Sequence, residues 1–477
     1  MVLNAQTNLA WDTLLPIEEG ALPNALHVRL TSALRDAIRA GKIPVGSALP
    51  PSRQLAGDLR CSRWVVTEAY EQLVAEGYLE ARVGSGTRVR LRDHQQPEPK
   101  QALLEETPTL RFDLTPGLPD FNAFPRSAWS RSIHDTITSM RRADLDYQSS
   151  GGHPRLRRVL AEYLGRVRGA VVHEDDVTIT SGILDGLSLM LRALVAANRI
   201  RVAIEDPCWG RLVAATQRTG LDVAPIEVDA EGMQTGDLSD VLVDAVIVAP
   251  AHQFPTGMVL TPERRMLLLE WARAADGLVL EDDYDAEFRY DRRPVGVLQG
   301  IDPARVALFG SLSKTLAPGV GVGWVVTPRR WTEALRSVEA RLTGPSTVEQ
   351  LALAGLIETG AYDRHLRALR RTYRARRDLL VRTMVMRLPQ CRVFGAAAGL
   401  HVLMGLPVGV TGEELATQLD ARGIHVHDLR ACNVGLRRRR AGDLPREGIV
   451  FGYGNLPDDQ VDAVVTEIGT AIRSLRS

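Results

Sequence analysis

The sequence predicts a chain of two folded parts: a small helical module with a β-hairpin, followed by a large α/β body. Three observations support this prediction. A chain of 477 residues is too long for a single hydrophobic core. The first ninety residues combine helical periodicity with a glycine-rich hairpin pattern. Beyond about residue 150, short apolar runs alternate with helical segments, which is typical of a mostly parallel sheet covered on both faces.

The composition is that of an ordinary globular protein, with 45% apolar and 24% charged residues. We find no apolar run of membrane-spanning length and no signal-peptide pattern, so we expect a cytoplasmic protein without membrane contact. The cysteines are too widely spaced for a zinc site or a disulfide framework, and no metal is expected. They are Cys61, Cys208, Cys391 and Cys432.

Charge is distributed unevenly along the chain. Residues 26–92 carry 11 Lys and Arg against 6 Asp and Glu, a net of +5, whereas the whole chain is neutral. A basic N-terminal module on a mildly acidic body fits a nucleic-acid contact confined to one end. On charge alone, a solvated basic surface is the better explanation, and it is the motifs that favour a nucleic-acid contact.

Three helices are expected in the N-terminal module. Apolar residues at 26, 30, 34 and 38 predict a helix that ends at Gly41. A second helix follows Pro50 and Pro51 with Ser52 as its N-cap, and Ser62 caps a third. The second and third helices form a helix-turn-helix, whose later helix enters the DNA major groove. The inner face of that helix is Val66, Ala69, Tyr70 and Leu73.

The third helix is expected to end at 77–80, and residues 81–89 predict a hairpin with a Gly-Ser-Gly tip, the wing. The run "ALPPSRQLAGDLRCSRWVVTEAYEQLVAEGYLEARVGSGTRV" closely resembles the GntR-type winged helix. Trp64 departs from the small or polar residue usual there. Arginines at helix N-termini can reach phosphates or guanine edges, and a glycine tip lets a hairpin approach the backbone. The resemblance implies contacts with duplex DNA from Ser52, Arg53, Ser62, Arg63, Gly86 and Arg88.

A polar, proline-rich segment separates the two parts. We expect a DNA-binding domain at 20–92, a linker at 93–110 and a body at 111–477, with a large part at about 150–330 and a smaller α+β part at about 331–477. A surface loop of one domain is the alternative to a linker.

The body is predicted to contain buried strands with amphipathic helices such as 185–196 and 262–275 between some of them. From Ser346 onward long helices dominate, including an arginine-rich helix at 365–387 that we interpret as a solvated or dimer-facing surface. Arg437–Arg440 is expected in a loop. The predicted strands are Val177–Thr180, Arg201–Glu205, Ala245–Ala249, Leu278–Glu281, Val306–Phe309 and Trp324–Thr327.

Six motifs in the body resemble those of pyridoxal phosphate (PLP)-dependent aminotransferases of fold type I, in the family's order. They are "DYQSSGGHPRLRRVLAEYL", "ITSGILDGL", "IEDPCWG", "APAHQFPTG", "LEDDYDAEFRY" and "GSLSKTLAP". Together with the winged helix, they make nearly the whole chain from Leu26 onward resemble the MocR/GabR type of bacterial transcription regulator. One such motif alone would be weak, but several in order are specific.

The resemblance implies a role for each motif. Lys314 would form the Schiff base with PLP, as an internal aldimine. Asp282 would pair with the pyridinium nitrogen, Tyr284 would hydrogen-bond the phenolic oxygen, and Trp209 would stack on the ring. His252 would lie in the loop facing the ring edge. The phosphate is expected to bind the main-chain N–H groups of a strand-to-helix turn, formed by Gly182, Ile183 and Leu184. The hydroxyl groups of Ser311 and Ser313 would add two further donors.

Three positions depart from the family pattern. Gly321 stands where an arginine usually binds the cofactor phosphate, a loss of roughly 1.5–3 kcal/mol. Val450 stands where an arginine usually holds a substrate carboxylate, and Leu184 replaces a glutamine. Arg430 or another arginine could compensate. The protein is therefore not expected to be a working transaminase.

Three functions remain open. The favoured one is a DNA-binding regulator whose body binds PLP and senses PLP, an amine or an amino acid. A cofactor-free regulator could instead use the altered pocket for another ligand or only to dimerise. A functional aminotransferase with a fused DNA-binding domain is the third. We expect a homodimer for two reasons. Two winged helices would bind two half-sites of DNA. The resemblance also implies active sites that form at a subunit interface.

Overall fold

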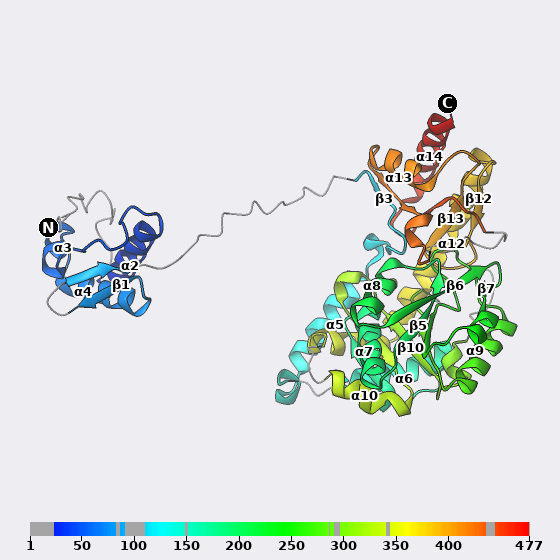
Figure 1. Cartoon of the computed structure of the whole chain (residues 1–477), viewed down its shortest axis with the longest axis horizontal. Helices are drawn as coiled ribbons and strands as arrows, with labels where there is room; N and C mark the ends of the chain where they lie inside the picture. Colours follow the sequence, from blue (N-terminus) through cyan, green and yellow to red (C-terminus); the bar gives the residue numbers. More distant parts are fainter. Residues whose placement is uncertain are drawn as a thin grey trace. The chain divides into compact units, whose positions relative to one another are not determined.

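The computed structural model describes residues 23–82, 86–90, 110–147, 151–285, 287–290, 296–339, 344–435 and 444–476. The chain forms two compact units, residues 1–107 and 108–477, each described by itself (Figure 1). None of the helices in these ranges combines the length and the hydropathy that a membrane crossing requires. The predicted linker lies outside the described residues except for Leu110, and so does the predicted loop at Arg437–Arg440.

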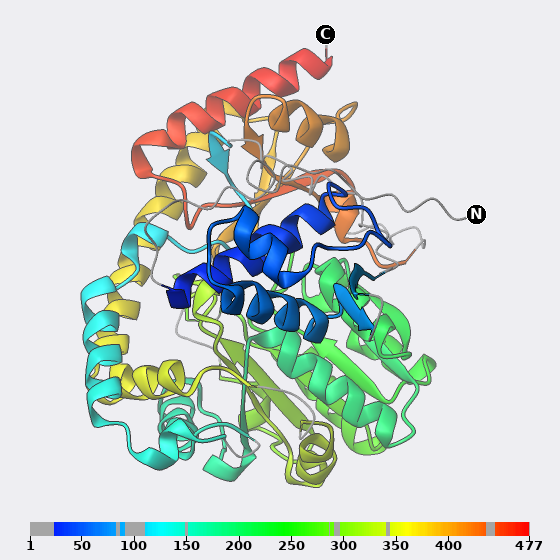
Figure 2. The same cartoon turned by 90° about the vertical axis from the view of Figure 1, so that its left-hand side faces the viewer.

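The described part of the first unit consists of helices and a hairpin around one core (Figure 2). Leu30 and Leu34 of the first helix meet Leu55 of the second and Val66 and Leu73 of the third, and all are fully buried. The expected inner face of the third helix is thus confirmed. The elements are α2 (Pro23–Arg39), α3 (Ser52–Asp58), α4 (Arg63–Ala75), β1 (Leu79–Arg82) and β2 (Gly86–Val89).

Two local predictions in this unit are wrong. Ser52 is the first residue of α3 and not its cap, because Pro51 has an extended ψ of 141° and takes the capping position. The chain leaves α4 after Ala75 and already pairs in β1 at Leu79, so the hairpin begins two residues earlier than expected. Ser62 does occupy the N-cap of α4, although its side chain makes no capping hydrogen bond. The tip of the hairpin, 83–85, lies outside the described residues.

The second unit is built on an eight-stranded sheet with the order β4-β11-β10-β9-β8-β5-β6-β7. The strands from β10 to β6 run parallel, and β11 is antiparallel to both of its neighbours. All of the strands predicted from the sequence are confirmed, and β6 and β7 were missed. Their bounds are β4 (Val177–Thr180), β5 (Arg201–Asp206), β6 (Asp222–Asp229), β7 (Gly232–Met233), β8 (Ala245–Val248), β9 (Leu278–Asp282), β10 (Val306–Ser311) and β11 (Gly323–Val326).

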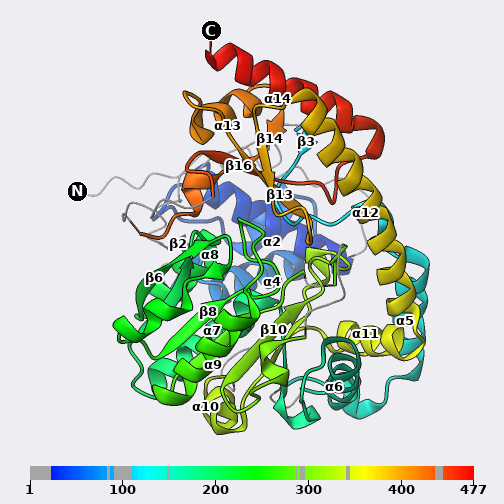
Figure 3. The ribbon, with the colours of Figure 1, turned by 90° about the vertical axis from the view of Figure 1, so that its right-hand side faces the viewer.

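Helices cover both faces of this sheet (Figure 3). Alternate residues of β8 show the division, because Ala245 and Ile247 join the core under α7 whereas Val246 and Val248 join the core under α9. The expected doubly covered sheet is therefore confirmed. The helices of this part are α5 (Arg126–Ser139), α6 (Pro154–Arg168), α7 (Ile183–Ala196), α8 (Gly210–Arg218), α9 (Pro262–Ala274) and α10 (Arg329–Glu339).

The C-terminal part pairs helices with a four-stranded sheet of order β12-β13-β16-β15. The long helix α12 runs from α11 to α14 and links the two parts of the unit (Figure 3). The sheet confirms the α+β character expected of this part, although none of its strands was placed from the sequence. The elements are α11 (Thr347–Glu358), α12 (Ala361–Arg387), β12 (Arg392–Phe394), β13 (His401–Gly405), α13 (Gly412–Asp420), β15 (His427–Asp428), β16 (Gly448–Gly452) and α14 (Val461–Arg476).

Candidate functional site

The helix-turn-helix of the first unit brings the predicted DNA-contacting residues to one region. Ser52 and Gly86 both line a groove of about 490 Å³ between α3, α4 and the hairpin. Arg63, the first residue of α4, is exposed, and its Nε donates to Ser52 Oγ over 3.3 Å. Arg53 is exposed in the first turn of α3. Two arginines at adjacent helix N-termini therefore face solvent, as contact with phosphates requires.

Two residues of the module have structural contacts that the sequence did not reveal. Arg88 is half-buried and donates through a guanidinium nitrogen to Gly46 O over 3.1 Å, so it also supports the turn before α3. The Trp64 side chain is 50% exposed, and its ring meets His27 of α2 edge-on at 5.4 Å between centroids. Trp64 therefore packs against the module itself while keeping one side open.

The second candidate site lies at the strand ends of the second unit. Lys314 follows β10 by three residues, and Asp282 is the last residue of β9. Because β9 and β10 are parallel neighbours, their carboxyl ends meet at one edge of the sheet. The turn at Gly182 connects β4 to α7, and β4 is the neighbour of β11. The fold thus gathers the predicted residues at one edge.

Lys314 extends toward a glycine from the start of the second unit. A Cβ atom at Gly117 would lie 2.5 Å from Lys314 Nζ, far inside van der Waals contact. Gly117 also has a φ of +80°, which L side chains rarely adopt. A side chain at position 117 would force the end of Lys314 to move, and no sequence motif marks Gly117.

Asp282 is a half-buried residue whose carboxylate has one buried oxygen without a partner in the described part of the chain. Its Oδ1 is inaccessible to solvent and has no hydrogen-bond partner among the described residues. Burial, with the negative charges of Asp285 and Asp283, raises the pKa of Asp282 to about 7, and the charge of Lys314 opposes this rise. Burial in turn lowers the pKa of Lys314, against the attraction of Asp285 and Asp282. Such an oxygen would accept a hydrogen bond from a protonated ring nitrogen.

Tyr284 is connected to a buried imidazole and a buried carboxylate. Its hydroxyl oxygen lies 3.1 Å from His252 Nδ1, and Asp285 Oδ2 lies 2.9 Å from the same nitrogen. Burial raises the pKa of Tyr284 well above its ordinary value, so its hydroxyl keeps its proton. His252 was expected in this loop, but the sequence analysis assigned no role to Asp285.

The first turn of α7 provides the predicted anion site. Gly182 is the N-cap, and Ile183 and Leu184 open the helix, whose first N–H groups have no intrahelical acceptor. Ser311 is buried at the end of β10, and its Oγ accepts from the Ser313 N–H over 3.4 Å. The roles of these residues remain predictions.

Gly321 has no side chain that could contribute a positive charge to this anion site. Gly321 ends a short 3-10 helix with a φ of +62°, and a Cβ there would meet no atom within 4 Å. Arg430, considered as a substitute, forms an ion pair with Glu447.

Trp209 caps α8 directly after β5. Its ring is half-buried, packs against the core under α7 and lies 5.7 Å from the Arg211 guanidinium. The main chain of Cys208 donates to Cys432 O over 2.8 Å, so this turn is tied to the C-terminal part.

Val450 and His401 face the site from the C-terminal sheet. Val450 is fully buried in an apolar cluster with Leu403 and Leu429, against which Phe254 packs. His401 is 1% exposed, and neither of its ring nitrogens has a hydrogen-bond partner among the described residues. Nothing in the local sequence marks His401, because its neighbours come from distant segments.

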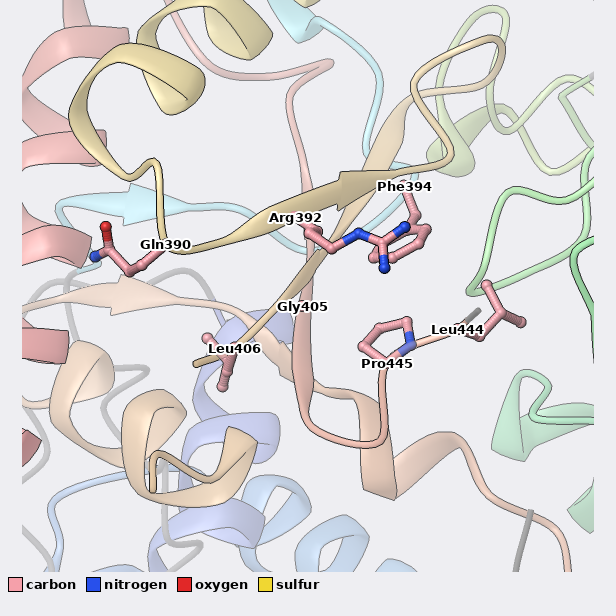
Figure 4. Close-up of a pocket in the computed structure, with 7 residues that line it drawn as sticks. All are labelled: Gln390, Arg392, Phe394, Gly405, Leu406, Leu444 and Pro445. Atoms are coloured by element: carbon pink, nitrogen blue, oxygen red, sulfur yellow. The ribbon is translucent and has the colours of Figure 1, made fainter. Parts of the chain in front are cut away.

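A separate surface pocket of about 300 Å³ opens at the edge strand β12 (Figure 4). The guanidinium of Arg392 lies over the Phe394 ring, 5.0 Å from its centroid, inside this pocket. None of the residues predicted for the cofactor lines it. The lining residues are Gln390, Arg392, Phe394, Gly405, Leu406, Leu444 and Pro445.

Comparison with known families matches both units. Residues 26–89 match the family described as "Bacterial regulatory proteins, gntR family", and residues 113–444 match "Aminotransferase class I and II". The "HTH-type pyridoxine biosynthesis transcriptional regulator PdxR" of Corynebacterium glutamicum is 32% identical over 94% of this chain and 96% of its own length. The chain belongs to the MocR/PdxR-type transcriptional regulators. GntR-type regulators bind DNA, and the aminotransferase family of the second unit is PLP-dependent.

Other relatives of this MocR/PdxR-type regulator agree. The "Probable rhizopine catabolism regulatory protein MocR" of Rhizobium meliloti is 29% identical over 95% of this chain and 94% of its own length. Among solved structures, an archaeal alanine:glyoxylate aminotransferase is similar with a TM-score of 0.69 at 21% identity, covering 78% of this chain and 92% of that one. The kynurenine aminotransferase of Pyrococcus horikoshii gives a TM-score of 0.69 at 22% identity, over 77% and 92%. These two structural similarities establish the fold of the second unit.

Proposed function

We propose that this regulator binds PLP through Lys314 and changes its binding to an operator according to the state of that site. The observation that carries the proposal is the buried, unpartnered Oδ1 of Asp282 at the strand end beside Lys314. A buried oxygen of this kind requires a donor, and the protonated pyridine nitrogen of PLP is one. The room that Gly117 leaves around Lys314 Nζ supports the same assignment.

Each neighbouring residue has a task in holding the cofactor. Lys314, whose pKa is lowered by burial, offers an amino group that is neutral more often than that of an exposed lysine. Tyr284 would donate to the phenolic oxygen, since its hydroxyl stays protonated. Trp209 would cover the ring. When bound, PLP supplies an electrophilic carbon that captures primary amines.

The anion site would hold the phosphate with less charge than usual. The N-terminus of α7 and the hydroxyls of Ser311 and Ser313 supply donors, but Gly321 supplies none. This arrangement favours a cofactor that exchanges with solution over one that is retained permanently. Exchange is what a sensor of PLP requires, and a relative at 32% identity is named as a regulator of pyridoxine biosynthesis.

The signal is expected to pass to DNA through a homodimer. Two helix-turn-helix units would read two half-sites, and an effector can shift operator binding only if it binds two arrangements of the dimer unequally. We assign DNA binding to residues 20–92, tethering to 93–110 and effector binding to 111–477. Ser52, Arg53, Ser62, Arg63, Gly86 and Arg88 would contact the operator.

A simple measurement tests cofactor binding. Purified protein incubated with excess PLP should turn yellow, and borohydride should bleach the colour and leave a covalent adduct on Lys314 that mass spectrometry locates. Lys314→Ala should stay colourless with an unchanged far-UV circular dichroism spectrum. Wild-type protein that stays colourless would overturn the proposal in favour of a cofactor-free regulator, which the loss of charge at Gly321 and Val450 also favours.

A further inference from the structure

One face of β13 and β16 in the C-terminal sheet contacts the loop of His252 and Phe254 in the large part of the unit. His401 lies opposite Gly452 and Leu403 opposite Val450 in the antiparallel register. Residues two apart on a strand share a face, so His401, Leu403 and Val450 lie on the same side of the sheet. The ring of His401 contacts Phe254 and His252 of the large part, at 5.1 and 4.8 Å between centroids.

One portion of this face is apolar. Val450, Leu403 and Leu429 are fully buried together, and Phe254 and Phe394 pack against them. A carboxylate placed against these side chains would lose its hydration without gaining a cation from them. This wall therefore disfavours an amino acid.

The other portion consists of two buried imidazoles, those of His401 and His252. His401 and His252 are each 1% exposed; by hydrogen-bond geometry, neither ring nitrogen of His401 nor Nε2 of His252 has a partner among the described residues, although the main chain of Pro255 lies near the His401 ring. Burial, together with the positive charges of His252 and Lys314, lowers the pKa of His401 well below its ordinary value. A neutral imidazole offers one donor and one acceptor, which matches a hydroxyl group that donates and accepts. Buried polar atoms of this kind normally have partners, so a ligand group is expected here.

We propose that the site around Lys314 selects a primary amine that carries a hydroxyl group and no carboxylate, with His401 as the hydroxyl-binding residue. The inference rests on the proposed function, because bound PLP is the group that would capture the amine. In that exchange, the amine nitrogen bonds to the aldehyde carbon of PLP as the bond from that carbon to Lys314 Nζ breaks. The protons lost by the amine pass to Lys314, and no oxidant or reductant is needed.

Three small amines test the selection on the full-length, PLP-loaded protein. Ethanolamine differs from ethylamine by a hydroxyl group and from L-serine by the absence of a carboxylate. Titration followed by the change in visible absorbance should give half-saturation by ethanolamine at about tenfold lower concentration than by either of the others. Wild-type protein that responds to L-serine as well as to ethanolamine, or to none of the three amines, would overturn the inference.

Variants assign the selection to residues. His401→Phe should remove the advantage of ethanolamine over ethylamine and keep the yellow colour, whereas His401→Gln, which retains a donor and an acceptor, should keep part of it. Val450→Arg should strengthen the L-serine response by about tenfold. Val408→Arg is the matched control, since Val408 is 98% exposed in the same part of the unit.

The outcomes separate the two proposals. Protein that stays colourless with excess PLP overturns the proposed function and this inference with it. Yellow protein whose His401→Phe variant still prefers ethanolamine overturns the inference alone. The wild-type and His401 comparisons decide the matter even where Val450→Arg does not fold, because they do not depend on it.

Discussion

Asp282 is the residue on which the cofactor assignment depends. Its carboxylate is held in a buried position beside Asp285, a like charge that makes ionisation costly. Without PLP, the folded protein keeps a proton on this group up to a pH of about 7. A cationic partner would remove that cost. A cationic ligand at this position would therefore stabilise the ionised carboxylate beyond what Lys314 does.

A pH dependence follows for the PLP-free protein. The folded pKa of Asp282 is raised from 3.8 to about 7, so its stabilising contribution is complete below pH 4 and is lost as pH rises toward 7. Between pH 5 and 8, the free energy of unfolding should fall more for wild type than for Asp282→Asn, by about 2 kcal/mol. Urea denaturation measures this difference. Asp459→Asn, at an exposed position, should behave like wild type, and equal slopes for Asp282→Asn would contradict the assignment.

The sequence predicted part of the site at this scale. Lys314, Asp282 and Tyr284 lie at or just after the end of a buried strand, in motifs that resemble the aminotransferase family, so the sequence was enough to propose them. His401, Asp285 and Gly117 escaped notice, because what matters about them is contact with distant segments. A histidine in a strand, an aspartate in an acidic run and a glycine in a turn carry no local sign of those contacts.

At the scale of single elements, the second helix of the helix-turn-helix, α4, begins with the exposed Arg63, for which we predict a DNA contact. Arg63→Ala should reduce operator affinity at least about tenfold, because a phosphate or guanine contact to a charged group is lost. Cofactor absorbance should not change. Fluorescence anisotropy with labelled operator DNA measures the affinity, and Arg218→Ala in α8 controls for loss of one exposed positive charge. Unaltered affinity in Arg63→Ala would contradict its role.

The turn between β4 and α7 depends on a glycine of the neighbouring strand. A Cβ at Gly323 would lie 2.7 Å from the Cα of Gly182, which is main chain and cannot move aside cheaply. Gly323→Ala should shift this turn and weaken PLP binding by about 1–3 kcal/mol. Gly319→Ala, where a Cβ meets nothing within 4 Å, should leave the PLP titration unchanged. Equal PLP affinities for the two variants would argue against an anion site at this turn.

In the eight-stranded sheet, strands were predicted correctly from the sequence where several buried residues follow one another. The strands from β4 to β11 that carry unbroken apolar runs were found from sequence. β6 was missed because it alternates buried and half-buried residues and contains Pro225, which is unusual in a strand. The short strands β12 and β15 have few residues and pair only through long-range contacts. Ser52 was misassigned because the choice between it and Pro51 as cap depends on backbone geometry.

At the scale of the whole molecule, the chain is two units with separate cores. The core of 1–107 contains residues of that unit alone, and the cores around the sheet contain residues of 108–477 alone. A fragment of residues 108–477 should therefore fold by itself and bind PLP with an affinity within about threefold of the full chain. Absorbance titration of the two proteins provides the comparison. A fragment that remains unfolded or colourless while the full chain turns yellow would contradict this independence.

The central claim is that the state of the Lys314 site controls DNA binding. The most direct measurement is operator affinity, on DNA from upstream of the protein's own gene, with and without PLP, for wild type and Lys314→Ala. PLP should change the wild-type affinity by at least about fivefold and leave that of Lys314→Ala unaltered. An identical PLP response in both proteins, or none in a wild type that has turned yellow, would contradict the account.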